Sequence, residues 1–392
     1  MILNTFAPPF RLVGGYFLVG LFYLLVSIFL FFYADFNALT SLNTAGFFHV
    51  FFVGFVLSII IGALYQLTSV ILESAFFSIK GAYLNLFIYA ISLLFFSAGM
   101  VFANDKFLHI GSKILFTSLL FFAITFFLSF LKGNKRSFAS FALFISSLFL
   151  IVGLIFGLFL ALIFAGKVSL DFELMLRYHI YFVIGFIFFV IIGAGSVLLP
   201  MFALSHKVNF LISKISIATY ILSGFFIFWN IKISLVMIII SFLLFVIQAI
   251  LILKNRVRKA FDYWNLNLFL SFISLIIFCF GFDKFGNSYS VFIITYGFLY
   301  PFIVAHFYKI VLFLVWYHYV SPFVGKQNVP LLDDMVKKNM AYSAFRLNLF
   351  AIFLSFFWLK ISILFLFFSI FLVCANTLHI FKFTKFGVKN ER

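Results

Sequence analysis

The chain has 392 residues, of which 66% are apolar and 9% are charged, and 70 of them are Phe. A soluble globular domain is about half apolar and about a quarter charged, so this composition excludes a soluble globular protein. With six prolines and two cysteines, the chain also differs from collagen-like, disordered and disulfide-scaffold proteins. We therefore interpret the formal net charge of +17 as a signal of membrane topology and not of nucleic-acid binding.

Continuous apolar runs follow one another along the whole chain. A membrane-spanning helix needs roughly 20 mostly apolar residues, and a helix satisfies its own backbone groups in lipid. We therefore predict an all-α polytopic membrane protein that forms a single integral membrane domain over residues 1–392. The twelve predicted spans are residues 12–33, 46–72, 82–103, 108–131, 138–165, 176–203, 208–229, 231–253, 262–281, 288–319, 341–358 and 360–381.

The basic residues predict how these spans are oriented. If the N-terminus, the loops after even-numbered spans and the C-terminus share one side, nineteen of the 27 Lys and Arg residues lie on that side. Seven lie on the opposite side, and Lys309 alone lies deep within a span, far from both of its ends. Because Lys and Arg concentrate on the cytoplasmic side, both termini are predicted to be cytoplasmic. The nineteen residues are Arg11, Lys80, Lys132, Lys135, Arg136, Lys207, Lys214, Lys254, Arg256, Arg258, Lys259, Lys326, Lys337, Lys338, Arg346, Lys382, Lys385, Lys389 and Arg392.

The second, sixth and tenth spans share a Gly-Phe motif. In the second and sixth spans another glycine follows eight residues after the first. Because these spans lie four apart, the motif predicts three like-oriented repeat units of four helices, at about residues 1–135, 136–260 and 261–392. The pairs are Gly54-Phe55, Gly185-Phe186 and Gly297-Phe298, and the second glycines are Gly62 and Gly193.

Packing of small residues explains these glycines but not the histidines that accompany them. His49 and His179 precede the Gly-Phe pairs by five and six residues, each at the predicted outer end of its span. In the second and tenth spans a tyrosine follows eleven residues after the glycine, as Tyr65 and Tyr308.

Three units of four helices with histidines on every fourth helix resemble the catalytic subunit of the haem-copper oxidases. Among the divergent relatives, the chain is similar to the NnrS-type nitric-oxide-response membrane proteins. Residues 49–70, 179–200 and 306–318 resemble the second, sixth and tenth helices of that superfamily. The resemblance implies a bacterial inner (cytoplasmic) membrane protein, with His49 in the position of a low-spin haem ligand and His179 in that of a copper ligand.

The resemblance fails at the other ligand positions. The seventh-helix copper histidines have no counterpart, because residues 209–229 contain no His, and the tenth-helix pair is absent near residues 289–292. An oxygen-reducing centre needs both haem iron and copper to be ligated, so we expect no oxygen reductase and no catalytic residue. The resemblance implies a degenerate member that binds haem or a metal near its outer face. It would act in respiratory electron transfer, nitric-oxide handling or metal and haem delivery, with the lipid bilayer and respiratory or other membrane subunits as partners.

By the predicted topology His49, His109 and His179 all lie on the outer side, near the starts of even-numbered spans. Imidazole binds haem iron, copper and zinc, so His49 and His179 are candidate cofactor ligands, and all three histidines are candidate metal ligands. The alternative is that each is an interfacial side chain with an apolar body and a hydrated tip.

His306 and Lys309 form a second candidate site inside the tenth span. They lie three residues apart on one helix face, and charged groups within a membrane usually face the bundle interior and mark function. Tyr308, Tyr65 and Gln66 are the polar partners we expect for Lys309, in a proton path or a polar ligand site. The alternative is a lysine that extends to the inner surface.

Two other functions remain open at this stage. One is a transporter or channel on a twelve-helix frame, although transporters are usually built of two repeats with helices broken at mid-membrane. The other is a membrane assembly factor without chemistry of its own. Neither phosphate-binding glycine loops nor His-Glu-x-x-His motifs occur in the sequence.

Overall fold

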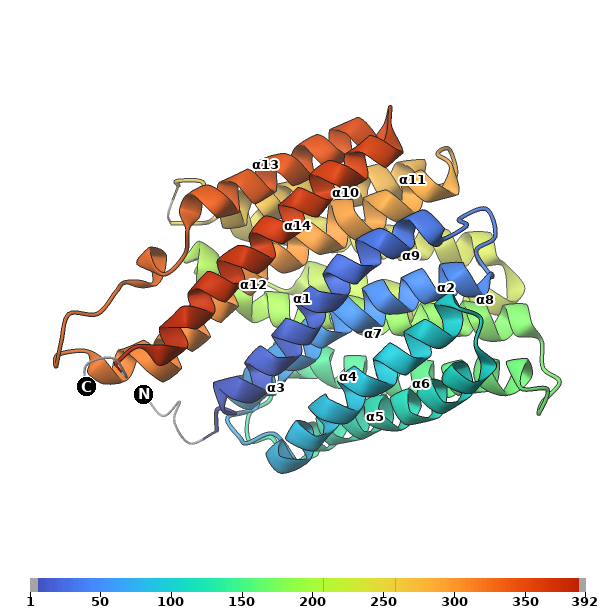
Figure 1. Ribbon diagram of the computed structural model, residues 1–392, viewed down its shortest axis with the longest axis horizontal. Helices are drawn as coiled ribbons and strands as arrows, with labels where there is room; N and C mark the ends of the chain where they lie inside the picture. The colour runs from blue at the N-terminus through green and yellow to red at the C-terminus, as the bar shows by residue number, and fades with distance from the viewer. Residues whose placement is uncertain (1–5, 207, 258, 388–392) are drawn as a thin grey trace. The chain divides into compact units, whose positions relative to one another are not determined.

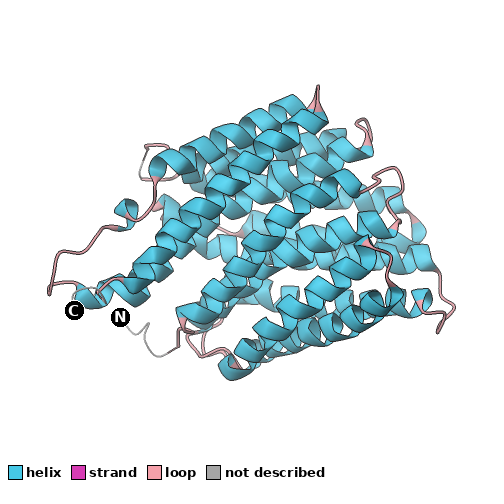
Figure 2. Cartoon of the chain, viewed as in Figure 1, coloured by secondary structure: helices cyan, strands magenta, loops and turns pink. Residues whose placement is uncertain are grey.

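The computed structural model describes residues 6–206, 208–257 and 259–387. In these residues the chain forms α-helices with short π-helical and 3₁₀-helical segments, and no strand is present (Figure 2). Four basic residues that the topology prediction used lie outside the described residues, namely Lys207, Arg258, Lys389 and Arg392.

Eleven helices among the described residues are long and apolar enough to cross a membrane. They confirm the prediction of an all-α membrane protein that crosses the bilayer many times. Nine of them are α1 (Phe10–Tyr33), α4 (Ile79–Val101), α5 (Asp105–Lys132), α6 (Phe138–Phe164), α7 (Phe172–Ala203), α8 (Leu211–Trp229), α9 (Ile231–Lys254), α10 (Tyr263–Gly281) and the segment Leu359–Lys385, which contains α14 (Leu359–Phe381) and η7 (Lys382–Lys385).

The other two of these eleven spans are composite. The span Leu42–Leu72 consists of α2 (Leu42–Phe48), the π-helix η2 (His49–Leu57) and α3 (Ser58–Leu72). The span Asn287–Phe323 consists of α11 (Asn287–Phe292), the π-helix η3 (Ile293–Leu299), α12 (Tyr300–Val315), the π-helix η4 (Trp316–Val320) and the 3₁₀-helix η5 (Ser321–Phe323). A short 3₁₀-helix, η6 (Leu332–Asp334), lies in the loop that follows.

The eleventh predicted span, residues 341–358, corresponds to α13 (Lys338–Ser355), which is not among the eleven helices that can cross a membrane. Its 18 residues include Lys338 and Arg346, and charged side chains are unfavourable in hydrocarbon. The number of twelve spans and the cytoplasmic location of the termini therefore stay predictions.

Polar residues that precede several helices explain where those helices begin. Their side-chain oxygens accept hydrogen bonds from first-turn N–H groups, which have no partner within the helix. Asn230 alone separates α8 from α9, which confirms the predicted break between those two spans. The capping residues are Ser41 for α2, Asn104 for α5, Ser137 for α6, Asp171 for α7, Asn230 for α9 and Asp262 for α10.

The chain divides into two compact units. Unit 1 comprises Met1–Pro8, Leu64–Gly99 and Asn104–Lys259, and unit 2 comprises Pro9–Ala63, Met100–Ala103 and Ala260–Arg392. The predicted single domain with three repeat units stays a prediction. Each unit is described by itself below.

In unit 1, aromatic side chains of α6, α7 and α8 form the centre of the packing. The rings of Tyr181 and Tyr220 stack with their centroids 5.0 Å apart, and each hydroxyl donates a hydrogen bond to the backbone carbonyl of the other residue. Phe149 packs edge-on against Phe189 at 4.8 Å. Because the polar tips of both tyrosines bond to backbone carbonyls, this core is satisfied without water.

In unit 2, α1 packs against η2, α10 packs against η3 and α12, and α13 packs along α14. Figure 1 shows α13 and α14 side by side, joined by a short turn. At the end of α1, the Phe31 ring lies against Phe36, Phe47 and Tyr296, and Ser27 shares a 2.8 Å hydrogen bond with the Tyr296 hydroxyl.

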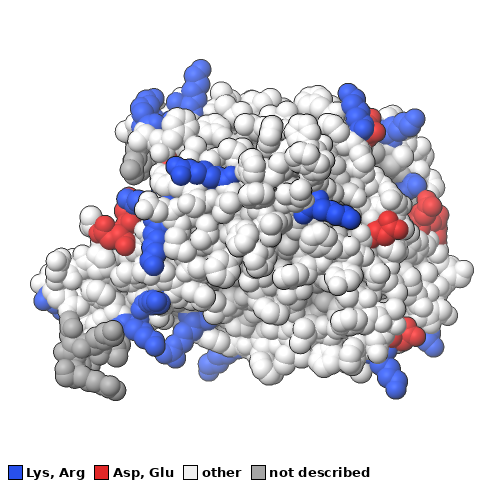
Figure 3. Space-filling model, turned by 45° about the horizontal axis from the view of Figure 1, so that its top comes forward, with Lys and Arg blue, Asp and Glu red and all other residues white. Residues whose placement is uncertain are grey.

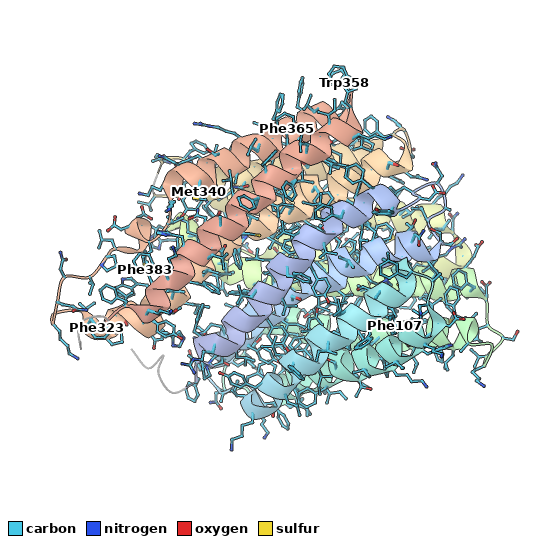
Figure 4. All side chains as sticks on the ribbon, in the orientation of Figure 1. Phe107, Phe323, Met340, Trp358, Phe365 and Phe383 are labelled. Carbon is cyan, nitrogen blue, oxygen red and sulfur yellow. The ribbon has the colours of Figure 1, made fainter. Side chains whose placement is uncertain are left out.

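Large apolar side chains stay exposed on the outer faces of the spans. Phe87 on α4 and Phe225 on α8 are 67% and 62% exposed, and the face in Figure 3 has broad surfaces without charged side chains. Trp358 projects from the turn between α13 and α14 (Figure 4). Apolar faces with aromatic residues at helix ends are typical of contact with a lipid bilayer.

Candidate functional site

His49 lies at the junction of α2 and η2 in unit 2. Its Nδ1 is 2.8 Å from the backbone carbonyl oxygen of Ala45, one helical turn earlier. A carbonyl oxygen only accepts hydrogen bonds, so Nδ1 carries the proton. In the neutral ring Nε2 then holds the lone pair, which is the form of histidine that binds iron or copper.

His179 has the same tautomer but a different anchor. It lies on α7 in unit 1, and its Nδ1 donates to the carbonyl oxygen of Gly153 on α6 at 2.9 Å. The ring also packs against Gly157, where an added Cβ would lie 3.0 Å from the imidazole Cε1. Two glycines four residues apart let α7 approach α6 closely, so the imidazole reaches a backbone carbonyl of the neighbouring helix.

His109 lies on α5 in unit 1 with an exposed side chain. His109 and His179 therefore belong to unit 1, and His49 belongs to unit 2. Within each unit, the described residues contain no group of three or more His, Cys, Asp or Glu side chains placed to hold a metal ion. The hypothesis that these three histidines bind a metal stays a prediction.

The π-helices mark two of the three motif-bearing spans. In a π-helix each carbonyl accepts from the N–H five residues later, which inserts extra residues into the helix, often at functional sites. η2 begins at His49 and contains Gly54, and η3 contains Gly297. α7, which carries Gly185, is a regular α-helix throughout.

The motif glycines share one structural role in all three spans. Each lies in close contact with the helix that precedes its own span. A Cβ on Gly54 would lie 2.6 Å from the Tyr23 Cβ of α1, and one on Gly297 would lie 3.0 Å from the Ser274 Cβ of α10. In unit 1, a Cβ on Gly185 would lie 2.6 Å from the Phe149 Cδ1 of α6.

The second candidate site lies in unit 2, where three consecutive residues at the start of α10 meet α12. We name these three residues, together with the polar and aromatic residues of α12 and α14 that surround them, the inner polar cluster. Asp262 and Lys309 form an ion pair in which Oδ2 of the carboxylate lies 2.9 Å from Nζ. The side chain of Asp262 is 24% exposed and that of Lys309 is 22% exposed. The inner polar cluster consists of Asp262, Tyr263, Trp264, His306, Tyr308, Lys309 and Asn376.

Asp262 uses its two oxygens for different purposes. Oδ1 accepts from the backbone N–H groups of Trp264 and Asn265, which caps α10. Oδ2 accepts from Lys309, whose ammonium also lies 5.5 Å from the centre of the Tyr263 ring. The lysine charge is therefore neutralised by a carboxylate at a helix end, and the pair joins α10 to α12.

The remaining members of the inner polar cluster extend these contacts. The buried ring of His306 lies edge-on to Trp264 at 6.4 Å, and its Nδ1 donates to the Phe302 carbonyl at 2.9 Å. Tyr308 packs edge-on against Tyr263 at 5.5 Å.

Asn376 of α14 connects Tyr308 to α13. Its Nδ2 donates to the Tyr308 hydroxyl and to the Lys337 carbonyl, and its Oδ1 accepts from the Lys337 N–H. The cluster thereby joins α10, α12, α13 and α14. The predicted proton path or polar ligand site at His306 and Lys309 stays a prediction.

The structure corrects the partner predicted for Lys309. We expected Tyr308, Tyr65 or Gln66, but the partner is Asp262, 47 residues away in sequence. Tyr65 and Gln66 belong to unit 1, where the Tyr65 ring packs against Phe76. The sequence signal for Asp262 is its position as an acidic N-cap before an apolar run. Its pairing with Lys309 could not be predicted, because no sequence pattern places α10 beside α12.

Zinc sites and haem sites differ in the number of protein ligands that they need. Zinc sites take three or four protein ligands, whereas haem iron needs one or two axial ligands. In each of the two histidines Nδ1 contacts a backbone carbonyl oxygen, so Nε2 carries the lone pair of the neutral ring.

No model of a known protein family matches the chain, and no curated protein matches its sequence.

Proposed function

We propose that this protein is a polytopic membrane protein that binds haem or a metal, with Nε2 of His49 as the ligand in unit 2 and Nε2 of His179 as the ligand in unit 1. The observation that carries the proposal is the tautomer that both rings share. In each ring Nδ1 donates to a backbone carbonyl, at 2.8 Å for His49 and 2.9 Å for His179. Histidines that bind metals usually have this outer hydrogen bond, because it fixes the ring and makes Nε2 the ligand.

The chain contributes orientation and an apolar setting to such a group. His179 is held between the Gly153 carbonyl and Gly157, so its ring has little freedom to rotate. His49 is held within its own helix at the first residue of η2. When bound, haem iron would supply one-electron chemistry or binding of a diatomic gas.

The wider proposal is a degenerate relative of the haem-copper oxidases with twelve spans and both termini in the cytoplasm. It lies in a bacterial inner membrane and acts in respiratory electron transfer, nitric-oxide handling or metal and haem delivery, beside other membrane subunits. It is not a competent oxygen reductase, because the sequence has no counterpart to most of the oxidase ligands.

The test is an optical and elemental analysis of the purified full chain, oxidised and reduced. We expect a Soret band with a stoichiometric haem content, lost or shifted in His49→Ala and in His179→Ala. His379→Ala is the matched control, because His379 lies on α14 outside the proposed ligand set, and it should retain the spectrum. All variants are first compared by size-exclusion chromatography to show that they are folded.

A preparation without Soret absorbance and without stoichiometric iron, copper or zinc would overturn the proposal. The same preparation tests the alternatives. Ion or solute flux across proteoliposomes that disappears in Lys309→Ala would support a transporter. Full complementation of a deletion phenotype by His49→Ala and His179→Ala would support an assembly factor without a cofactor.

A further inference from the structure

A small cavity lies within unit 1, between α7, the first turn of α8, and α9. Its volume is about 10 Å³, measured as the space open to the centre of a water molecule. A cavity of about 10–15 Å³ on this measure holds one water. Four lining residues carry the argument, namely Gly195, Ser196, Ser213 and Gln248.

Gln248, which lines this cavity, carries a polar atom without a protein partner. The side chain is 4% exposed, and its Oε1 has no hydrogen-bond partner within the protein. A buried carbonyl oxygen that loses its hydrogen bonds costs about 1–3 kcal/mol. Since Gln248 also lines the cavity, a guest there can satisfy this oxygen.

Ser196 of α7, another lining residue, carries a second candidate acceptor. Pro200 lies inside α7 and has no N–H, so the Ser196 carbonyl four residues earlier lacks its regular helical donor. The Ser196 hydroxyl donates to the Gly193 carbonyl at 2.8 Å, so its own proton is already used. The hydroxyl of Ser213, a residue that is 4% exposed, is both a donor and an acceptor.

We propose that this cavity binds one water molecule. The water donates hydrogen bonds to Gln248 Oε1 and to the Ser196 carbonyl, and it accepts one from the Ser213 hydroxyl. Buried waters typically make about three hydrogen bonds of this kind. A monovalent cation would find similar oxygens, but the lining residues include no carboxylate to compensate its charge, and an uncompensated charge in such a setting is costly.

The proposed water joins three helices at the proline position of α7. α7 supplies the Ser196 carbonyl, α8 supplies Ser213 and α9 supplies Gln248. The water therefore completes the hydrogen bonding of α7 where Pro200 interrupts it. This site is independent of the proposed cofactor, because no histidine contributes to it.

The test uses the full chain in nanodiscs with ¹⁵N-labelled glutamine. The sequence contains only three glutamines, Gln66, Gln248 and Gln327, so the side-chain amide signals are assigned by a single Leu substitution at each. We expect a long-lived nuclear Overhauser contact between water and the Gln248 amide. The absence of this contact, while the loop residue Gln327 shows exchange with bulk water, would overturn the proposal.

A cavity-filling variant gives a second measurement. A Cβ on Gly195 would meet only the Leu199 side chain, at 3.5 Å, so Gly195→Ala is expected to fold and to displace the water, with loss of the contact. Gly286→Ala is the control, because a Cβ there meets nothing within 4 Å, and it should leave the contact unchanged. Persistence of the Gln248 contact in folded Gly195→Ala would place the water elsewhere and overturn the proposal.

Stability and ion dependence complete the test. If water satisfies Gln248, Gln248→Leu removes those hydrogen bonds and lowers the Tm by a few degrees. If the cavity is dry, the same substitution removes an unsatisfied amide and raises the Tm, which would overturn the proposal. Gln248 signals that titrate with Na⁺ against a K⁺ reference would indicate a cation instead of water.

Discussion

The part of the span Leu42–Leu72 that lies in unit 2 and helix α7 in unit 1 carry the same sequence motif in different backbone conformations. In both, a motif glycine packs against the preceding helix. Gly54 contacts α1, and Gly185 contacts α6. The first span passes through nine residues of π-helix from His49 onward, whereas α7 is regular over 32 residues. The shared feature is therefore helix packing, and the backbone around the motif differs.

The histidines show what this difference means for a ligand site. His49 donates to Ala45 on its own helix, and His179 donates to Gly153 on the neighbouring helix. An anchor on the same helix depends only on local geometry, but an anchor on another helix depends on tertiary packing. The span Asn287–Phe323 has a π-helix like the first span, yet its polar residues lie farther along, in α12.

The largest effect is expected from adding a methyl group to the motif glycines. Gly54→Ala would place Cβ 2.6 Å from the Tyr23 Cβ, and Gly185→Ala would place it 2.6 Å from Phe149 Cδ1 and 2.7 Å from Tyr220 Cε1. Overpacking of this kind costs about 1–3 kcal/mol. Thermal unfolding in detergent should show both variants destabilised and Gly286→Ala unchanged. If only one of the two were destabilised, the spans would not share this packing.

The Lys309–Asp262 pair should give an intermediate effect. Lys309→Met leaves a carboxylate that is about a quarter exposed without its partner, and we expect a loss of roughly 1–2 kcal/mol, between the values typical of exposed and buried pairs. Lys338→Met is the control, because Lys338 and Asp333 are 50% and 47% exposed, and it should change stability by less than about 0.5 kcal/mol. Equal effects in the two variants would contradict a structural role for the inner polar cluster.

The smallest effect separates the two histidine anchors. Interhelical hydrogen bonds within membranes contribute about 0.6 kcal/mol on average, so His179→Ala should lower the free energy of unfolding by about that amount. His49→Ala removes a bond within one helix and should cost less. Unfolding of both variants without any cofactor measures the contribution of these hydrogen bonds alone. A greater loss of stability in His49→Ala than in His179→Ala would contradict the prediction that the interhelical bond contributes more.

Much of the architecture followed from local patterns. The apolar runs predicted twelve spans, of which eleven correspond to helices long and apolar enough to cross a membrane, and Asn230 was correctly placed at the break between two of them. α13 differed because Lys338 and Arg346 reduce its apolar character within a helix of 18 residues. The contacts within the inner polar cluster were predicted only in part, because the ion pair of Lys309 depends on how α10 lies beside α12.

Hydropathy and residue spacing alone were sufficient for the all-helical membrane fold and for the recurrence of glycine and histidine along the chain. Such features depend on neighbours within a few helical turns, and these are visible in sequence. The partner of Lys309, the anchor of His179 on Gly153, and the cavity beside Gln248 depended on which helices lie side by side. Each joins residues on different helices, so their chemistry was set by packing in three dimensions.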